Sequence, residues 1–201
     1  HPSLLWFTVF FSVGVLFSVR APGQARRMRQ APEGEAGRQR GPVLRISELE
    51  GLGRKAIVKT PEYRVTVNRG AKPAREWVRI QCEYETEPEW IDELIFQYHA
   101  LGMTREDGES RFSLYRKTVR YMDIEEGRDH LSVVFLRPSA LKRYGDLVAV
   151  AVEISHEGET VAAESETDIK MPERWWSNPA VVDNENVSIR NDYLIDRKQS
   201  P

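Results

Sequence analysis

Two neighbouring stretches, residues 77–85 and 94–101, alternate between apolar and polar residues and constrain the fold more than any other feature of the sequence. In the first stretch the alternate apolar residues are Val78, Ile80, Cys82 and Tyr84. A period of two places them on one face of a β-strand. The second stretch carries apolar residues on both faces, which is typical of a central strand. We therefore predict two strands that pair with each other across a turn over residues 86–93.

Short apolar stretches separated by turn residues continue along the chain. The further expected strands are 43–49, 56–59, 63–68, 111–124, 131–137, 146–155 and 160–165, with a turn at 126–129. Residues 138–145 read as one helical turn that Gly145 ends. Many short strands with few helices predict an all-β protein, and we expect an immunoglobulin-like β-sandwich over residues 43–172. Small residues predict close approach of the last hairpin to the opposite sheet: Ala149, Ala151, Ala162 and Ala163.

The N-terminal residues predict export. Residues 4–19 form a 16-residue apolar run, and the small residues Gly23 and Ala25 follow it. This length suits a signal peptide over residues 1–25, with an uncleaved membrane anchor as the alternative. Residues 26–42 hold five arginines, two glutamates and almost no apolar side chain, so they predict a basic flexible linker. We therefore expect an exported protein, or one that the N-terminal segment anchors in the membrane.

The charges and motifs argue against several classes of function. The residues after Pro42 contain 23 basic and 29 acidic side chains, and such an acidic body disfavours nucleic acid. The spacing of His99, His130 and His156 does not place two of them on one metal ion. Cys82 lies on the apolar face of its strand, which predicts a buried, unreactive thiol. No nucleotide-binding or nucleophile-elbow motif is present, so we expect no catalysis, no metal and no cofactor.

Three tryptophans are the candidate partner-binding residues. Trp90, Trp175 and Trp176 lie outside the predicted strands. Exposed indoles anchor protein partners or stack on sugars, whereas buried ones close the ends of a sandwich. Residues 173–201 form a Trp-containing tail, in which 187–197 is predicted to add a final strand to its own sheet or to a partner.

Several motifs together resemble a known family. They are Thr60-Pro61-Glu62-Tyr63, Trp77, the run PEWIDEL at 88–94, Trp175-Trp176 and YLIDR at 193–197. Over residues 43–201 the chain resembles exported Ig-like proteins of Verrucomicrobia-type bacteria, of which an Akkermansia member is encoded beside type IV pilus assembly genes. The resemblance implies an Ig-like fold and a location in the periplasm or at the cell surface of a Gram-negative-type bacterium. It also implies a pilus-associated or structural role without catalysis. The segment 178–186 matches nothing in that family.

Two functions remain open at this point. The first is a non-catalytic structural or assembly component of the cell envelope, associated with type IV pilus machinery, that binds protein partners through a sheet edge or the Trp-bearing ends. The second is a carbohydrate-binding or adhesive module that uses the same tryptophans. Membrane contact is expected only through the N-terminal segment.

Overall fold

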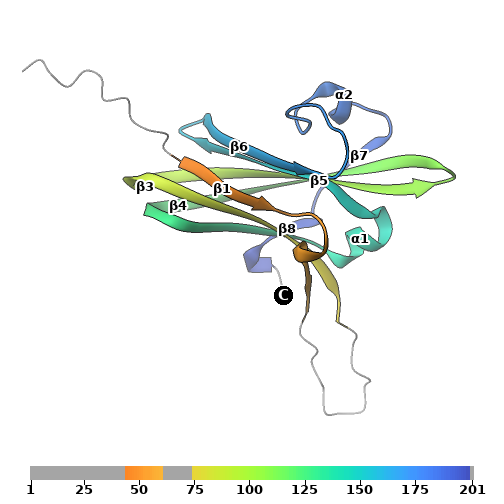
Figure 1. Ribbon diagram of the computed structural model, residues 1–201, viewed down its shortest axis with the longest axis horizontal. Coiled ribbons are helices and arrows are strands. Elements are labelled where there is room, and N and C mark those ends of the chain that lie inside the picture. The colour runs from red at the N-terminus through yellow and green to blue at the C-terminus, as the bar shows by residue number, and fades with distance from the viewer. Residues whose placement is uncertain (1–43, 61–73, 200–201) are drawn as a thin grey trace, which may run out of the picture. The chain divides into compact units, whose positions relative to one another are not determined.

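The computed structural model describes residues 44–60 and 74–199, in which eight strands form one sheet (Figure 1). The strands are β1 (Leu44–Glu50), β2 (Ile57–Lys59), β3 (Glu76–Glu106), β4 (Glu109–Leu136), β5 (Asp146–His156), β6 (Glu159–Thr167), β7 (Val187–Arg190) and β8 (Leu194–Asp196). The helices are α1 (Pro138–Tyr144) and α2 (Pro179–Val182), with 3-10 turns η1 (Arg54–Ala56) and η2 (Arg197–Gln199). The all-β class is confirmed. The expected N-terminal segments and the strand at 63–68 lie outside the described residues.

A single long hairpin of β3 and β4 organises the sheet. The two strands contain 31 and 28 residues and pair antiparallel from Val78–Leu136 to Glu106–Glu109. Their connecting turn lies at the light-green end of the hairpin in Figure 1. The turns predicted at 86–93 and 126–129 are therefore wrong, because both segments lie inside these strands. The stretches 77–85 and 94–101 are successive lengths of β3 and do not pair with each other.

A bulge bends the hairpin where the sequence had suggested a turn. The register of β3 against β4 shifts twice between residues 84 and 90. The Thr86 hydroxyl donates to the Glu125 carbonyl at 2.8 Å and accepts from the Gly127 N–H at 3.1 Å. Pro88 has no N–H to offer a partner, so it fits this interrupted part of the ladder. Bulges of this kind bend a strand without ending it.

Beyond the bend, the two halves of the hairpin pack against each other. The first half of β3 is paired with β1 and β2, and the second half with β5. The rings of Tyr84 and Phe96, one from each half, lie 5.0 Å apart. The Tyr98 hydroxyl donates to Ser132 Oγ at 2.7 Å between the layers. Strands that pass from one layer to the other through a bulge are a known way to build a sandwich, so the predicted β-sandwich is confirmed.

Apolar side chains of both layers fill an inner core. Its fully buried members include Ile80, Cys82, Phe96, Tyr98, Val134, Val150, Val152 and Ile154. Ile80 and Cys82 occupy alternate positions that the sequence pattern had assigned to one strand face. The period of two therefore located the core even where the turns were misplaced.

A second core lies on the opposite face of β5 and its neighbours. It contains Leu101, Leu114, Val148, Ala149 and Ala151, covered by Trp175 and Trp176. The small residues Ala149 and Ala151 thus allow close approach of the C-terminal segment, and the expectation that they face the opposite sheet is wrong.

The C-terminal residues belong to the same sheet. β7 pairs parallel with residues 112–115 of β4, and β8 pairs antiparallel with residues 134–136. The expected single strand at 187–197 is therefore two short strands. Residues 173–199 therefore belong to the folded unit, because two of their segments, β7 and β8, are strands of the sheet.

The helical turn predicted at 138–145 is present as α1. Pro138 occupies its first turn, where no N–H is needed. Gly145 ends it at φ 78°, and the Gly145 N–H donates to the Leu141 carbonyl at 3.1 Å. A side chain at this position would overlap the Met103 carbonyl, so glycine is required where α1 leads into β5.

Candidate functional site

The three candidate tryptophans lie in two different environments. Trp175 and Trp176 are 1 % and 6 % exposed, whereas Trp90 is 49 % exposed. The first two rings meet edge to face with centroids 5.9 Å apart, and Trp176 Nε1 donates to Glu153 Oε2 at 3.3 Å. These two residues pack the second core, so their predicted use as surface anchors is wrong for the folded chain.

Of the three candidate tryptophans, Trp90 is the one whose side chain is exposed to solvent. It lies in the bend of the hairpin, opposite Glu125 of β4. The same bend exposes Met122, which is 59 % accessible and pairs with Glu93. An exposed indole and a flexible thioether are each suited to contact with a partner. The structure does not bring Trp90 near the other two candidates.

His99 is a buried residue of the second core. It is 8 % exposed, and its ring lies 6.4 Å from that of Trp176. Within the described residues its Nδ1 atom has no hydrogen-bond partner. Burial and the nearby Arg116 guanidinium lower the pKa of His99 to about 4, against an opposing effect of Glu153. The imidazole is therefore neutral at physiological pH and acts as packing.

Cys82 is fully buried in the inner core, as the sequence predicted. Burial, followed by the carboxylates of Glu164 and Glu83, raises the pKa of its thiol to about 12. The thiolate is the nucleophilic form of cysteine, so this side chain is unreactive in the folded protein.

Within residues 44–60 and 74–199, no three His, Cys, Asp or Glu side chains are grouped so that they could hold a metal ion. The same ranges contain no helix that is long and apolar enough to cross a membrane.

The outer edge of β6 is the feature of the described chain best suited to contact with a partner. β6 ends the sheet order β6-β5-β3-β4-β7, and no described strand pairs with its other side. A groove of about 440 Å³ runs along this edge, lined by residues 160–165, Glu173, Arg174 and Trp176. Small side chains such as Ala162 and Ala163 leave the backbone accessible to another chain.

The register of β6 against β5 shows which backbone groups face the groove. The Asp168 N–H donates to the Val148 carbonyl at 2.9 Å, and antiparallel pairs alternate between bonded and non-bonded. With the register that follows, Ala163 and Ser165 turn their N–H and C=O groups away from β5. The Ser165 N–H donates to the carboxylate of Glu164 at 3.2 Å. A local side chain thus takes the place of a neighbouring strand.

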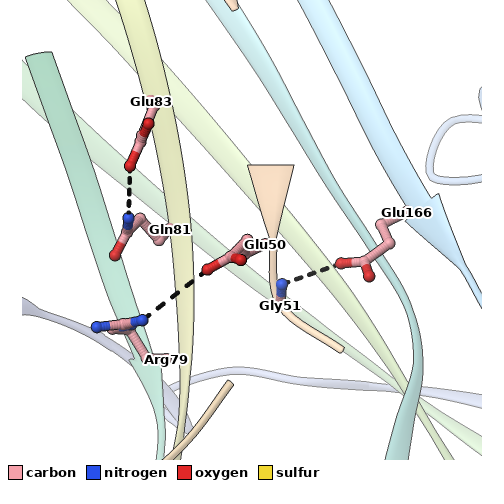
Figure 2. Close-up of polar contacts among 6 residues, drawn as sticks. All are labelled: Glu50, Gly51, Arg79, Gln81, Glu83 and Glu166. Atoms are coloured by element: carbon pink, nitrogen blue, oxygen red, sulfur yellow. Dashed lines mark hydrogen bonds and ion pairs between the residues drawn. The ribbon is translucent and has the colours of Figure 1, made fainter. Parts of the chain in front are cut away.

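Carboxylates surround this edge. Glu159, Glu164 and Glu166 lie on β6, and Glu173 and Arg174 lie at the rim of the groove. Glu166 is committed to the fold, because it accepts the Gly51 N–H at 3.0 Å (Figure 2). No ion pair in the described part of the chain involves Glu164 or Glu173. Because Glu164 and Glu173 outnumber Arg174 along the groove, its lining carries net negative charge.

Figure 2 shows how the end of β1 is tied to the neighbouring strands. Glu50 lies 3.9 Å from the Arg79 guanidinium, and Gly51 is bound to Glu166. A Cβ on Gly51 would approach Val150 within 3 Å, so the chain passes close to β5 here. These contacts fix β6 against β1 and leave the outer edge of β6 in a defined position.

Two basic hollows lie elsewhere on the sheet. One of about 470 Å³ is lined by Arg116, Lys117 and Arg137, and Lys117 pairs with Asp196 at 3.5 Å. The other, of about 160 Å³, contains Arg190, whose Nε donates to Ser113 Oγ at 3.0 Å and whose guanidinium covers the Tyr144 ring. Lys117 and Arg190 are therefore already engaged in contacts that hold β7 and β8 to β4.

Comparison with known proteins places the chain in a family. A protein-family model matches residues 54–201. The chain belongs to that family. A crystal structure of a protein from Akkermansia muciniphila matches with a TM-score of 0.61 and 18 % identity, over 79 % of this chain and 85 % of that chain. This likeness shows a common fold. No curated protein sequence matches.

The sequence did not single out the edge of β6. The sequence feature that marks this edge is the composition of the last hairpin strand, whose residues 161–167 (VAAESET) are mostly small and acidic. Such a composition is typical of an edge strand protected from uncontrolled pairing. It identifies the edge only once the strand order is known.

Proposed function

We propose that this protein is a non-catalytic structural or assembly component of a bacterial cell envelope, and that it binds protein partners. The observation that carries the proposal is the free edge of β6, the outer side that no described strand pairs with, and its groove of about 440 Å³. Backbone groups at an open edge bind extended segments of other proteins in many assemblies. Family membership and the fold shared with an Akkermansia protein support an envelope role.

Association with type IV pilus machinery is the finer part of the proposal. It rests on the motif resemblance of residues 43–201 to exported Ig-like proteins. Export rests on the apolar run at 4–19 and the small residues at 23 and 25. On this proposal the folded unit lies outside the inner membrane, in contact with other envelope proteins.

Cross-linking in the native envelope tests this function. The full chain is expected to form specific cross-links to envelope or pilus assembly proteins, and its mature N-terminus is expected at Arg26. A mature form that keeps Trp6 would show that residues 1–25 are an uncleaved membrane anchor and not a signal peptide. Recovery in the cytoplasm, or cross-links to no envelope protein, would contradict the proposal.

A carbohydrate-binding or adhesive role remains the second candidate because Trp90 is exposed. An indole face stacks on sugar rings, but two of the three expected platforms are buried. Binding to an array of surface glycans that disappears in Trp90→Ala, with an unchanged unfolding midpoint, would favour this role over the first.

A further inference from the structure

We propose that the free edge of β6 receives an extended, lysine- or arginine-bearing segment of a partner protein, which adds to the sheet as a further strand. The inference rests on the proposed function and names the site and the chemistry of the partner. It follows from three observations: outward backbone groups, a groove that admits a chain, and net negative charge along that groove.

The backbone of β6 is prepared for another strand. Ala163 and Ser165 direct their N–H and C=O groups away from β5, as the register shows. A strand that adds here gains ladder hydrogen bonds without displacing any described strand. The adjacent small side chains, Ala162 and Ala163, permit the spacing of about 5 Å between paired strands.

Glu164 links backbone pairing to charge. Its carboxylate accepts the outward Ser165 N–H at 3.2 Å while the edge is empty. When the carbonyl of an incoming strand takes that N–H, the exposed Glu164 carboxylate is released and can pair with a cation. A lysine or arginine on the incoming strand supplies it, and Glu173 offers a second carboxylate at the rim. Among the described residues, Arg174 is the one cation that lines the same groove, so the balance of charge there is acidic.

The acidic edge also selects against other strands. An acidic segment would place like charges beside Glu164 and Glu173, and a neutral one would leave the released Glu164 carboxylate without a cation. Like charges across a strand pair are destabilising. The same carboxylates that protect the edge from indiscriminate pairing thus favour one class of partner.

A labelled peptide of about nine residues, alternating lysine and threonine, is the probe, and a glutamate–threonine peptide of equal length is its counterpart. Fluorescence anisotropy with the full chain is expected to detect binding of the basic peptide only. Ala163→Pro removes an outward N–H and leaves the β5 ladder intact, so affinity should fall at least about tenfold. Ala163→Ser keeps the N–H and should bind as the wild type does. Glu164→Gln should weaken binding and reduce its dependence on salt.

A second measurement leaves the protein unaltered, in case Ala163→Pro does not fold. Methylation of every backbone amide of the basic peptide should abolish binding, because neither edge of the peptide strand then has an N–H group to donate to β6. Methylation of alternate amides leaves one edge free and should preserve binding. Equal binding by all three peptides would show that charge alone holds them, and the proposed strand addition would be wrong.

Other outcomes would also overturn the inference. They include equal affinities of Ala163→Pro and Ala163→Ser, and equal binding of the acidic and basic peptides. Self-association of the wild type that Ala163→Pro abolishes would assign the edge to a second copy. If Ala163→Pro keeps every envelope cross-link, the proposed function stands and this site is wrong. If the wild type has no envelope cross-link, the proposed function itself fails.

Discussion

On the outer face of β5, Trp175 and Trp176 cover the small side chains of Ala149 and Ala151. An indole buries more apolar area than any other side chain, and alanines let it approach the sheet closely. The two tryptophans therefore hold the C-terminal segment to a face of the sheet that would otherwise be exposed. Their pairing in sequence reflects this packing and not a binding surface.

Truncation of Trp175 measures this role against an exposed control. Trp175→Ala should lower the free energy of unfolding by about 3–5 kcal/mol, because it leaves a cavity beneath the C-terminal segment. Trp90→Ala should change it by less than about 0.5 kcal/mol, because that side chain is half exposed. Urea denaturation compares the two variants. Equal effects would show that Trp175 does not cover the second core as described.

His99 makes stability depend on pH. Because its pKa is lowered to about 4 in the folded state, the unfolded chain binds more protons between about pH 4 and 6.5. The stabilisation is complete above about pH 6.5 and is lost as the pH falls toward 4, by on the order of 2–3 kcal/mol. Urea midpoints measured across this range should fall less steeply in His99→Gln, in which that group no longer titrates. Parallel profiles for the wild type and the variant would contradict this assignment.

The bent hairpin is the element on which both layers depend, and Thr86 holds its bend. Thr86→Val keeps the side-chain shape but leaves the Gly127 N–H and the Glu125 carbonyl without that hydroxyl. We expect a loss of about 1–3 kcal/mol in stability by chemical denaturation. Thr118→Val, at an exposed position of β4, is the matched control and should have little effect. If Thr86→Val had no effect on stability, water or the His130 ring, whose Nε2 lies 3.0 Å from the Glu125 carbonyl, would replace the Thr86 hydroxyl as a hydrogen-bond partner.

Element types were predictable from the sequence, but their connections were not. Alternation identified the buried faces of residues 77–85 and 94–101, and Gly145 identified the end of α1. Pro88 and the loss of alternation marked a break in the ladder, but a turn and a bulge produce the same local pattern. The choice between them depends on pairing with β4, which is distant in sequence.

The candidate site was less predictable for a related reason. Whether a tryptophan is buried depends on which face of the sheet its segment covers. Val148–Val152 has apolar residues on both faces, so a second layer must bury the face that points away from the inner core. Trp175 and Trp176 of the C-terminal segment bury that face. The outward groups of Ala163 and Ser165 follow only from strand order and register. The local sequence determines neither the face that the C-terminal segment covers nor the order and register of the strands.

In the whole described unit, β3 and β4 pass through both layers of the sandwich. The inner core and the second core therefore contain side chains from the same two strands. Separate unfolding of one layer would require breaking the ladder of the same hairpin at the bend. We therefore expect one cooperative transition, in which both cores are lost together.

Two probes, one in each core, test this cooperativity. Labelling of Cys82 reports the inner core, because the thiol is fully buried. Tryptophan fluorescence reports Trp175 and Trp176 in the second core when it is measured in a background with Trp6, Trp77 and Trp90 replaced by phenylalanine. Their urea midpoints should coincide in the wild type, and Trp175→Ala should shift both by the same amount although Cys82 lies in the other core. Ile57→Ala, at a 40 % exposed position of β2, should move neither. If the fluorescence changed at lower urea than Cys82 labelling, the C-terminal segment would unfold first. The bent hairpin would then not couple the layers, and the tail would be a separately released part of the sheet.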